Sequence, residues 1–103
     1  MTPQSFHILV ALADRDLHGY AIMRDIAERT SGKIQLRAGT LYGAIQRLLE
    51  QGLVTELPVT EGSERRRSYR LTPAGRRAAK AETARLTELV NYARSHGLAP
   101  KRA

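Results

Sequence analysis

Length, composition and charge already exclude several classes of protein. The chain has 103 residues, of which 42% are hydrophobic and 26% are charged, and it contains no cysteine. These values are typical of one soluble globular domain and exclude a large multi-lobed enzyme, a disulfide framework and a cysteine nucleophile. A formal charge of +7 favours a polyanionic partner, either nucleic acid or an anionic membrane surface. No apolar run approaches the length of a membrane-spanning helix, so we expect nucleic acid as the partner and a cytoplasmic location.

The positive charge lies mainly in the second half of the chain. Residues 1–52 hold six cations and five anions, whereas residues 53–103 hold eleven cations and five anions. The densest run extends from Arg65 to Lys80 and contains no acidic residue. Charges of one sign at this spacing repel each other and are tolerated either on a solvated face or against an anionic partner. The run therefore agrees with nucleic-acid binding without requiring it.

The first thirty residues predict two helices. Thr2-Pro3 is a capping residue followed by a proline at the first helical position, and the helix that it starts ends near Asp14. A turn over residues 15–19 follows, and the Thr-Ser-Gly sequence at 30–32 stops the second helix. Residues at helical spacing mark one face of each helix, namely Phe6, Leu9, Val10 and Ala13 in the first and Tyr20, Met23, Ile26 and Ala27 in the second.

A third helix is predicted to begin between Ala38 and Thr40 and to end at Gln51, before Gly52. It has one apolar stripe and one outer face that is polar and, at its start, without bulky side chains. Tyr42 lies on the border between the two faces. The stripe holds Leu41, Ile45, Leu48 and Leu49, and the outer face holds Gly39, Thr40, Gly43, Gln46, Arg47 and Glu50.

The second half predicts a β-hairpin and one long helix. Residues alternate in the manner of strands over 53–57 and again over 67–71. Thr72-Pro73 then repeats the helix-start signal, and this last helix continues to about His96, a length of roughly 35 Å. We expect a winged helix-turn-helix DNA-binding domain over residues 1–72, a dimerisation helix over 73–97 and a disordered tail over 98–103.

The order of these elements is that of a winged helix-turn-helix, a mostly α fold with a β-hairpin wing (α+β). The third helix of such a fold enters the major groove, where Gln46 can pair with adenine and Arg47 with guanine or phosphate. Arginines beyond the wing tip can reach phosphates or the minor groove. Taken singly, each residue fits an ordinary protein surface; together they favour contact with double-stranded DNA. The candidate DNA-binding residues are Arg37, Thr40, Tyr42, Gly43, Gln46, Arg47, Arg65, Arg66 and Arg67.

The last helix has an apolar stripe that extends beyond what a core of about seventy residues covers. A second copy of the helix would bury this stripe and give a two-fold dimer, whose recognition helices meet successive major grooves about 34 Å apart on a pseudo-palindromic site. The alternative is that the helix folds back along the first helix. The candidate dimerisation residues are Leu86, Leu89, Val90 and Ala93.

Nothing in the sequence predicts catalysis. His7, His18 and His96 fall on three different elements, and no acid pair or histidine–acid spacing resembles a metal site or an activated nucleophile. We expect His18 to shape a turn and His7 to lie at the surface. We expect no enzyme activity, no cofactor and no metal.

Three stretches of the chain carry a family resemblance. They are Leu-His-Gly-Tyr-Ala-Ile at 17–22, the region 39–54 with Gly-Thr-Leu-Tyr at its start and Gln-Gly-Leu-Val at its end, and Arg-Ser-Tyr-Arg-Leu-Thr-Pro-Ala-Gly at 67–75. Together they resemble the PadR family of winged-helix transcriptional regulators, in its short subgroup with a single C-terminal helix. The resemblance implies a homodimer joined through that helix packing on the first helix, which acts usually as a repressor released by a signal. It also implies that Thr40 and Tyr42 contact DNA.

The chain departs from the family pattern at three positions. Gly43 stands where many relatives have proline, Leu49 where an acid is common, and Ser68 where an aromatic residue is common. Some short members bind flat aromatic effectors with tryptophan, which this chain lacks, so no effector site is predicted. The leading hypothesis is a sequence-specific DNA-binding repressor. The alternative is a winged-helix module whose basic face docks on an acidic protein.

Overall fold

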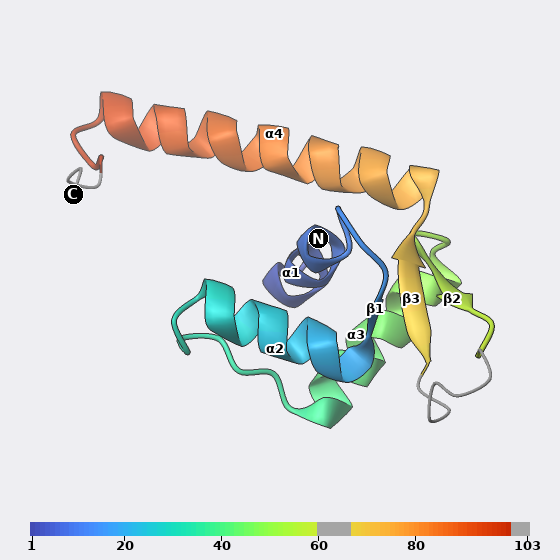
Figure 1. The fold of residues 1–103 in the computed structure, drawn as a ribbon. Helices are drawn as coiled ribbons and strands as arrows, with labels where there is room; N and C mark the ends of the chain where they lie inside the picture. The colour runs from blue at the N-terminus through green and yellow to red at the C-terminus, as the bar shows by residue number, and fades with distance from the viewer. Residues whose placement is uncertain (60–66, 100–103) are drawn as a thin grey trace.

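The structure, a computed structural model, describes residues 1–59 and 67–99. Three helices precede a small sheet, and a long fourth helix follows it (Figure 1). This confirms the predicted mostly α arrangement with a hairpin. In chain order the elements are α1 (Pro3–Ala11), β1 (Leu17–His18), α2 (Gly19–Arg29), α3 (Ala38–Glu50), β2 (Val54–Leu57), β3 (Ser68–Leu71) and α4 (Pro73–Ser95).

The core lies where α1, α2 and α3 pack against one another and against the sheet. Each fully buried isoleucine or leucine there contributes about 1.5–3 kcal/mol by leaving water. The predicted stripe of α3 is confirmed, except that Leu49 is half-buried and Ala44 is buried instead. The buried apolar residues are Ile8, Leu9, Ala11, Leu12, Ile22, Ile26, Leu41, Ala44, Ile45, Leu48, Val54 and Tyr69.

Two of the predicted helix faces are corrected by the structure. On α2 the buried residues include Ile22 and Ile26, and Tyr20 is exposed, so its predicted place on the apolar face is wrong. On α1, Leu9 is buried but Val10 is exposed and faces a groove beside α4. Local periodicity does not reveal which neighbour covers a helix, and here α4 occupies one side of α1. The first helix also ends at Ala11, three residues before the predicted end, with Leu12 as its cap.

A short strand replaces part of the predicted turn at 15–19. Leu17 pairs with Tyr69, so the three antiparallel strands lie in the order β1-β3-β2. A two-residue strand carries no periodicity, which is why the sequence did not predict it. Arg70 on β3 donates hydrogen bonds from Nε and Nη2 to the two carboxylate oxygens of Asp16, at 3.1 Å and 2.8 Å. This ion pair joins the turn before α2 to the middle strand.

The predicted hairpin is confirmed, with β2 and β3 paired so that Val54 faces Leu71. The loop residues 60–66 lie outside the described part of the chain. Strand β2 ends at Leu57, directly before Pro58, because proline cannot donate a backbone hydrogen bond to a neighbouring strand.

The long helix α4 begins and ends close to the predicted residues. Thr72 caps its start by accepting from the backbone N–H of Gly75 at 3.0 Å. Gly75 is buried against the carbonyl oxygen of Leu53, where a Cβ atom would overlap that oxygen. This contact attaches the start of α4 to the hairpin. The rest of the helix crosses α1 and extends well past it (Figure 1).

Within residues 1–59 and 67–99, no helix is both long and apolar enough to cross a membrane. The same residues contain no group of three or more histidine, aspartate or glutamate side chains placed to hold a metal ion.

Candidate nucleic-acid interface

The outer face of α3 carries most of the residues predicted to contact DNA. Arg37, Thr40, Gln46 and Arg47 are all exposed. Arg37 is the N-cap residue of α3, and its side chain makes no capping hydrogen bond. Gln46 donates from Nε2 to Glu50 Oε1 at 3.3 Å, which leaves its carbonyl oxygen and one N–H for another partner. The face therefore offers two guanidinium groups, an amide and a hydroxyl to a ligand.

The start of this face is open at Gly39, and Arg47 lies against Gly43. A Cβ atom at Gly39 would meet no atom within 4 Å, and one at Gly43 would lie 3.7 Å from Nη1 of Arg47. The Arg47 side chain thus lies back over Gly43, toward the start of the helix, as helical side chains do. The resulting surface lets another molecule approach the α3 backbone closely.

Tyr42 joins the start of α2 to α3. It is 46% exposed, and the end of its ring lies against Gly19, where a Cβ atom would overlap the phenol. Glycine permits this close approach, because a side chain at position 19 would have to displace the end of the ring. Burial, with smaller contributions from Glu56 and Tyr42, raises the pKa of Tyr69 on β3, so this hydroxyl keeps its proton at neutral pH.

Of the three arginines predicted to follow the wing tip, the structure describes one. Arg67 Nε lies 3.8 Å from Oε1 of Glu56 across the hairpin, and both side chains are largely exposed. An exposed pair of this kind contributes about 0–1 kcal/mol, so Arg67 can exchange Glu56 for a phosphate at little cost. Arg65 and Arg66 lie outside the described residues, and their role stays a prediction.

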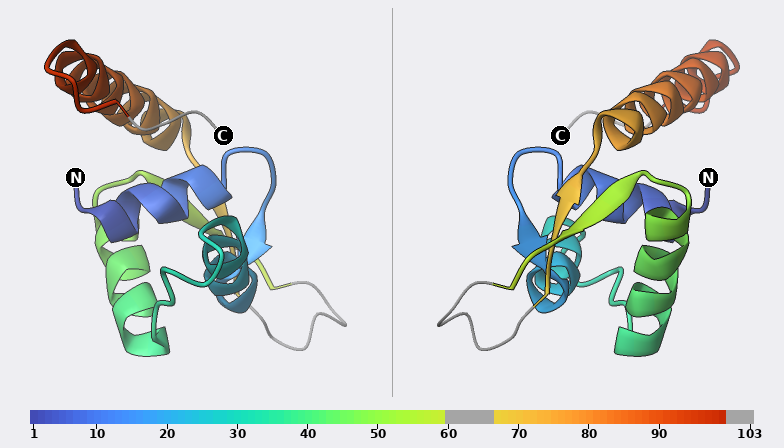
Figure 2. Two further views of the ribbon diagram at one scale, coloured as in Figure 1. Left: turned by 90° about the vertical axis from the view of Figure 1, so that its left-hand side faces the viewer. Right: turned by 90° about the vertical axis from the view of Figure 1, so that its right-hand side faces the viewer.

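These elements face one side of the molecule. The start of α3, the start of α2, the end of β2 and the beginning of β3 lie at the side opposite α4 (Figures 1 and 2). The start of α3 and the loop ends of the hairpin strands therefore lie on the same side of the molecule, away from α4.

Two exposed residues of α2 are not among the DNA-binding residues predicted from the sequence. Tyr20 is 57% exposed, and the guanidinium carbon of Arg24 lies 5.7 Å from the centroid of its ring. The sequence signal for this cation–π pair is the spacing of four residues between a tyrosine and an arginine on one helix.

Part of the basic run contacts other elements of the same chain. Arg70 is bound to Asp16, and the hydrogen bond from Arg70 lowers the pKa of that carboxyl group. Arg76 on α4 donates from Nη2 to the carbonyl oxygen of Ala13 at 2.6 Å. Both arginines thus connect the segment between α1 and α2 to later elements.

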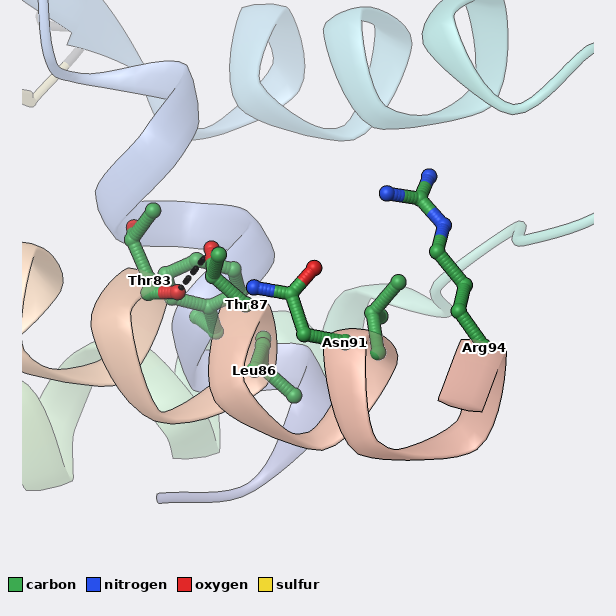
Figure 3. Close-up of a pocket in the computed structure, with 7 residues that line it drawn as sticks. Thr83, Leu86, Thr87, Asn91 and Arg94 are labelled. Carbon is green, nitrogen blue, oxygen red and sulfur yellow. Dashed lines mark hydrogen bonds between the residues drawn. The ribbon is translucent and has the colours of Figure 1, made fainter. Parts of the chain in front are cut away.

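A groove runs between α1 and the exposed side of α4. One part of it, of about 310 Å³, is lined by Phe6 and Leu86, and an adjoining part, of about 260 Å³, is lined by Val10 and Ala79. Thr83 lines both parts, so the groove is continuous along α4. Figure 3 shows Thr87, Asn91 and Arg94 projecting from α4 on the side of Thr83, which gives the groove a polar edge.

The predicted dimerisation residues divide into two groups. Leu86 and Val90 line the groove. Leu89 is 56% exposed outside it, and Ala93 is half-buried. The described part of the chain therefore leaves three large hydrophobic residues of α4 exposed, namely Leu89, Val90 and Tyr92.

The sequence matches the Transcriptional regulator PadR-like family over residues 8–81. Transcriptional regulator Rv3488 of Mycobacterium tuberculosis is 38% identical over 84 residues, which cover 81% of this chain and 75% of that protein. An uncharacterized 37.1 kDa protein in transposon TN4556 of Streptomyces fradiae is 45% identical over 82 residues. These cover 80% of this chain but 22% of the Streptomyces protein, so the chain spans about a fifth of the length of that relative.

Solved structures that share the fold include the following two. A PadR family transcription regulator from Clostridium difficile has a TM-score of 0.83 at 24% identity, over 92% of this chain and 98% of the other. Bacillus subtilis PadR in complex with operator DNA has a TM-score of 0.71 at 21% identity, over 81% of this chain and 48% of the other. Since the family match covers most of the chain, from α1 into α4, the protein belongs to the PadR-like family of transcriptional regulators.

Proposed function

We propose that this regulator binds double-stranded DNA in a sequence-specific manner and represses transcription, acting in the cytoplasm as a homodimer on a pseudo-palindromic operator. The observation that carries the proposal is the outer face of α3, which is polar, open at Gly39 and on the same side as the hairpin. An α-helix with such a face fits the major groove. The solved complex of Bacillus subtilis PadR with operator DNA, which shares the fold, supports this use of it.

The residues of this face divide by what they contact. Gln46 and Arg47 read base edges, since an amide can pair with adenine and a guanidinium with guanine. Arg37, Thr40 and Arg67 contact phosphates, which gives affinity without sequence information. The first four of these residues lie along α3 or at its cap, and Arg67 follows on the same side of the molecule, on the hairpin.

The homodimer is supported by α4. The groove beside it and the exposed Leu89 and Val90 form a contiguous apolar surface, and such surfaces mark sites of protein–protein contact. The same helix from a second copy would cover this surface and hold two α3 helices at a fixed separation. Two-fold pairing then matches a site with two half-sites about 34 Å apart.

A DNA titration tests the proposal. Fluorescence anisotropy would compare duplex DNA from upstream of the protein's own gene with a random duplex, at 0.15 M salt. We expect a clear preference for the first duplex, and a slope of log affinity against log salt of about −7, from eight neutralised phosphates in the dimer. Equal affinity for both duplexes at this salt concentration would refute sequence-specific binding.

Two substitutions separate the roles of the residues. Arg47→Ala should narrow the gap between specific and random DNA. Arg67→Ala should instead weaken binding to both and make the salt slope shallower by about 0.9 for each phosphate that is no longer neutralised. Both side chains are exposed, so the fold should be unaffected. Equal effects of the two substitutions on specificity would contradict this division.

The dimer is tested by sedimentation. Val90→Glu places a charge at the groove, where Val90 is exposed in the single chain, so it should leave each protomer folded and separate the dimer into monomers. Analytical ultracentrifugation would measure this, with Glu88→Gln as a control on the same helix. A persisting Val90→Glu dimer would place the interface elsewhere.

A further inference from the structure

The first half of α2 carries an exposed aromatic residue, Tyr20, and an exposed arginine, Arg24. Tyr20 is more than half exposed, although an aromatic side chain gains free energy by burial. The guanidinium of Arg24 lies over its ring, and the ring of His18 is stacked near it, with 6.5 Å between the two centroids. Within residues 1–59 and 67–99 Arg24 has no carboxylate within 4.0 Å, unlike Arg15 and Arg29, which both contact Asp25.

The start of α2, which carries Tyr20, is held from two sides. Gly19, directly before Tyr20, lies against Tyr42 of α3. Leu17, two residues before Gly19, pairs with Tyr69 of the hairpin. The first turn of α2 therefore sits between α3 and the hairpin, on the side of the molecule opposite α4 (Figure 2).

We propose that Tyr20 and Arg24 form a phosphate-binding site for the DNA backbone at the edge of the major groove that α3 enters. The Tyr20 hydroxyl and the Arg24 guanidinium donate hydrogen bonds to phosphate oxygens. The ring of Tyr20 holds the guanidinium in place before DNA binds, so less side-chain entropy is lost on binding. This site rests on the proposed function, and it adds α2 as a third contact element beside α3 and the hairpin.

Salt-dependent titrations of two charge-matched variants test the site. Arg24→Gln and Arg77→Gln each remove one positive charge from an exposed arginine, but Arg77 lies on α4, at the opposite side of the molecule. If each protomer neutralises one phosphate fewer, the salt slope of the dimer becomes shallower by about 1.8 and affinity at 0.1 M salt falls about sixtyfold. We expect this for Arg24→Gln on specific and random DNA alike, and little change for Arg77→Gln.

A third variant separates the hydroxyl from the ring. Tyr20→Phe keeps the ring under Arg24 and removes one hydrogen-bond donor, so we expect about a tenfold fall in affinity per protomer with the salt slope unchanged. Thermal denaturation of all three variants checks that these exposed positions leave the fold intact.

The outcomes distinguish the site from the proposed function. Wild-type protein that binds no DNA overturns both. Wild-type protein that binds its own upstream DNA, with Arg24→Gln and Arg77→Gln indistinguishable in affinity and salt slope, overturns the α2 site alone. A Tyr20→Phe variant with wild-type affinity removes the hydroxyl from the site and leaves Arg24 as its only donor.

Discussion

Replacing Gly39 with alanine should strengthen the fold and weaken DNA binding. Gly39 is the second residue of α3, and a Cβ atom there would meet nothing within 4 Å. Glycine inside a helix is about 0.5–1 kcal/mol less favourable than alanine, and for a residue in the first turn we expect a difference at the lower end of that range. We expect Gly39→Ala to raise the free energy of unfolding by about 0.5 kcal/mol, which raises the melting temperature by about 2–4 °C.

The same methyl group should interfere with DNA. The outer face of α3 is open at Gly39 in the unbound protein, and the proposed complex fills that space with base edges. Disrupting one good base interaction costs about 1–3 kcal/mol, so operator affinity should fall by about five- to 150-fold. Binding to random DNA, which is held by phosphate interactions, should weaken less.

Urea denaturation and anisotropy titration on the same samples measure both effects. Gly52→Ala is the matched control for stability, because a Cβ atom there also meets nothing within 4 Å, but φ is +73°. This conformation is strained for alanine, so Gly52→Ala should destabilise the fold by about 1 kcal/mol. A stabilised Gly39→Ala protein with unchanged operator affinity would refute the close approach of DNA to this part of α3.

Three further substitutions test how the fold holds the interface. Gly75→Ala should lower the free energy of unfolding by about 3 kcal/mol in urea denaturation, because its Cβ would overlap a backbone oxygen that cannot move aside. Gly19→Ala meets the flexible end of Tyr42, so it should change stability by less than about 1 kcal/mol yet shift Tyr42 signals in NMR spectra; a destabilisation as large as that of Gly75→Ala would contradict this. Asp16→Asn removes a carboxylate whose pKa in the folded protein is lowered by the hydrogen bond from Arg70. The ionised Asp16 carboxylate therefore stabilises the fold above pH about 4, the pKa of an unfolded aspartate, and this stabilisation disappears as the pH falls through the lower pKa of the folded state. Denaturation curves at neutral and strongly acid pH should therefore show a difference from wild type only at neutral pH, and a difference that persists in acid would be a counterexample.

Much of the fold followed from local signals. The starts of α1 and α4 were predicted at Thr2 and Thr72 because a capping hydroxyl followed by proline acts within a single turn of chain. The outer face of α3 was predicted because one helix with one buried stripe fixes its opposite face by periodicity alone. These features depend on neighbours within four residues along the chain, so local spacing is enough to predict them.

Other features of the structure were decided only by distant contacts. Tyr20 has a large aromatic side chain, which local periodicity places in the core. It is exposed because Ile22 and Ile26 lie on the face of α2 that packs against the core. Gly19 has no local reason to be glycine, since its neighbour is Tyr42, which lies more than twenty positions further along the chain.

The sequence by itself determined the order of the helices, the basic second half, the polar face of α3 and the long apolar stripe of α4. All of these follow from the composition of a segment or from the spacing of residues within it. Only the tertiary structure decided that β1 exists, that Arg70 is bound to Asp16 and that Gly19 at the start of α2 lies against Tyr42 of α3. The physical reason is that such contacts join residues far apart in the chain, and their energies depend on the packing of the whole domain rather than on any one segment.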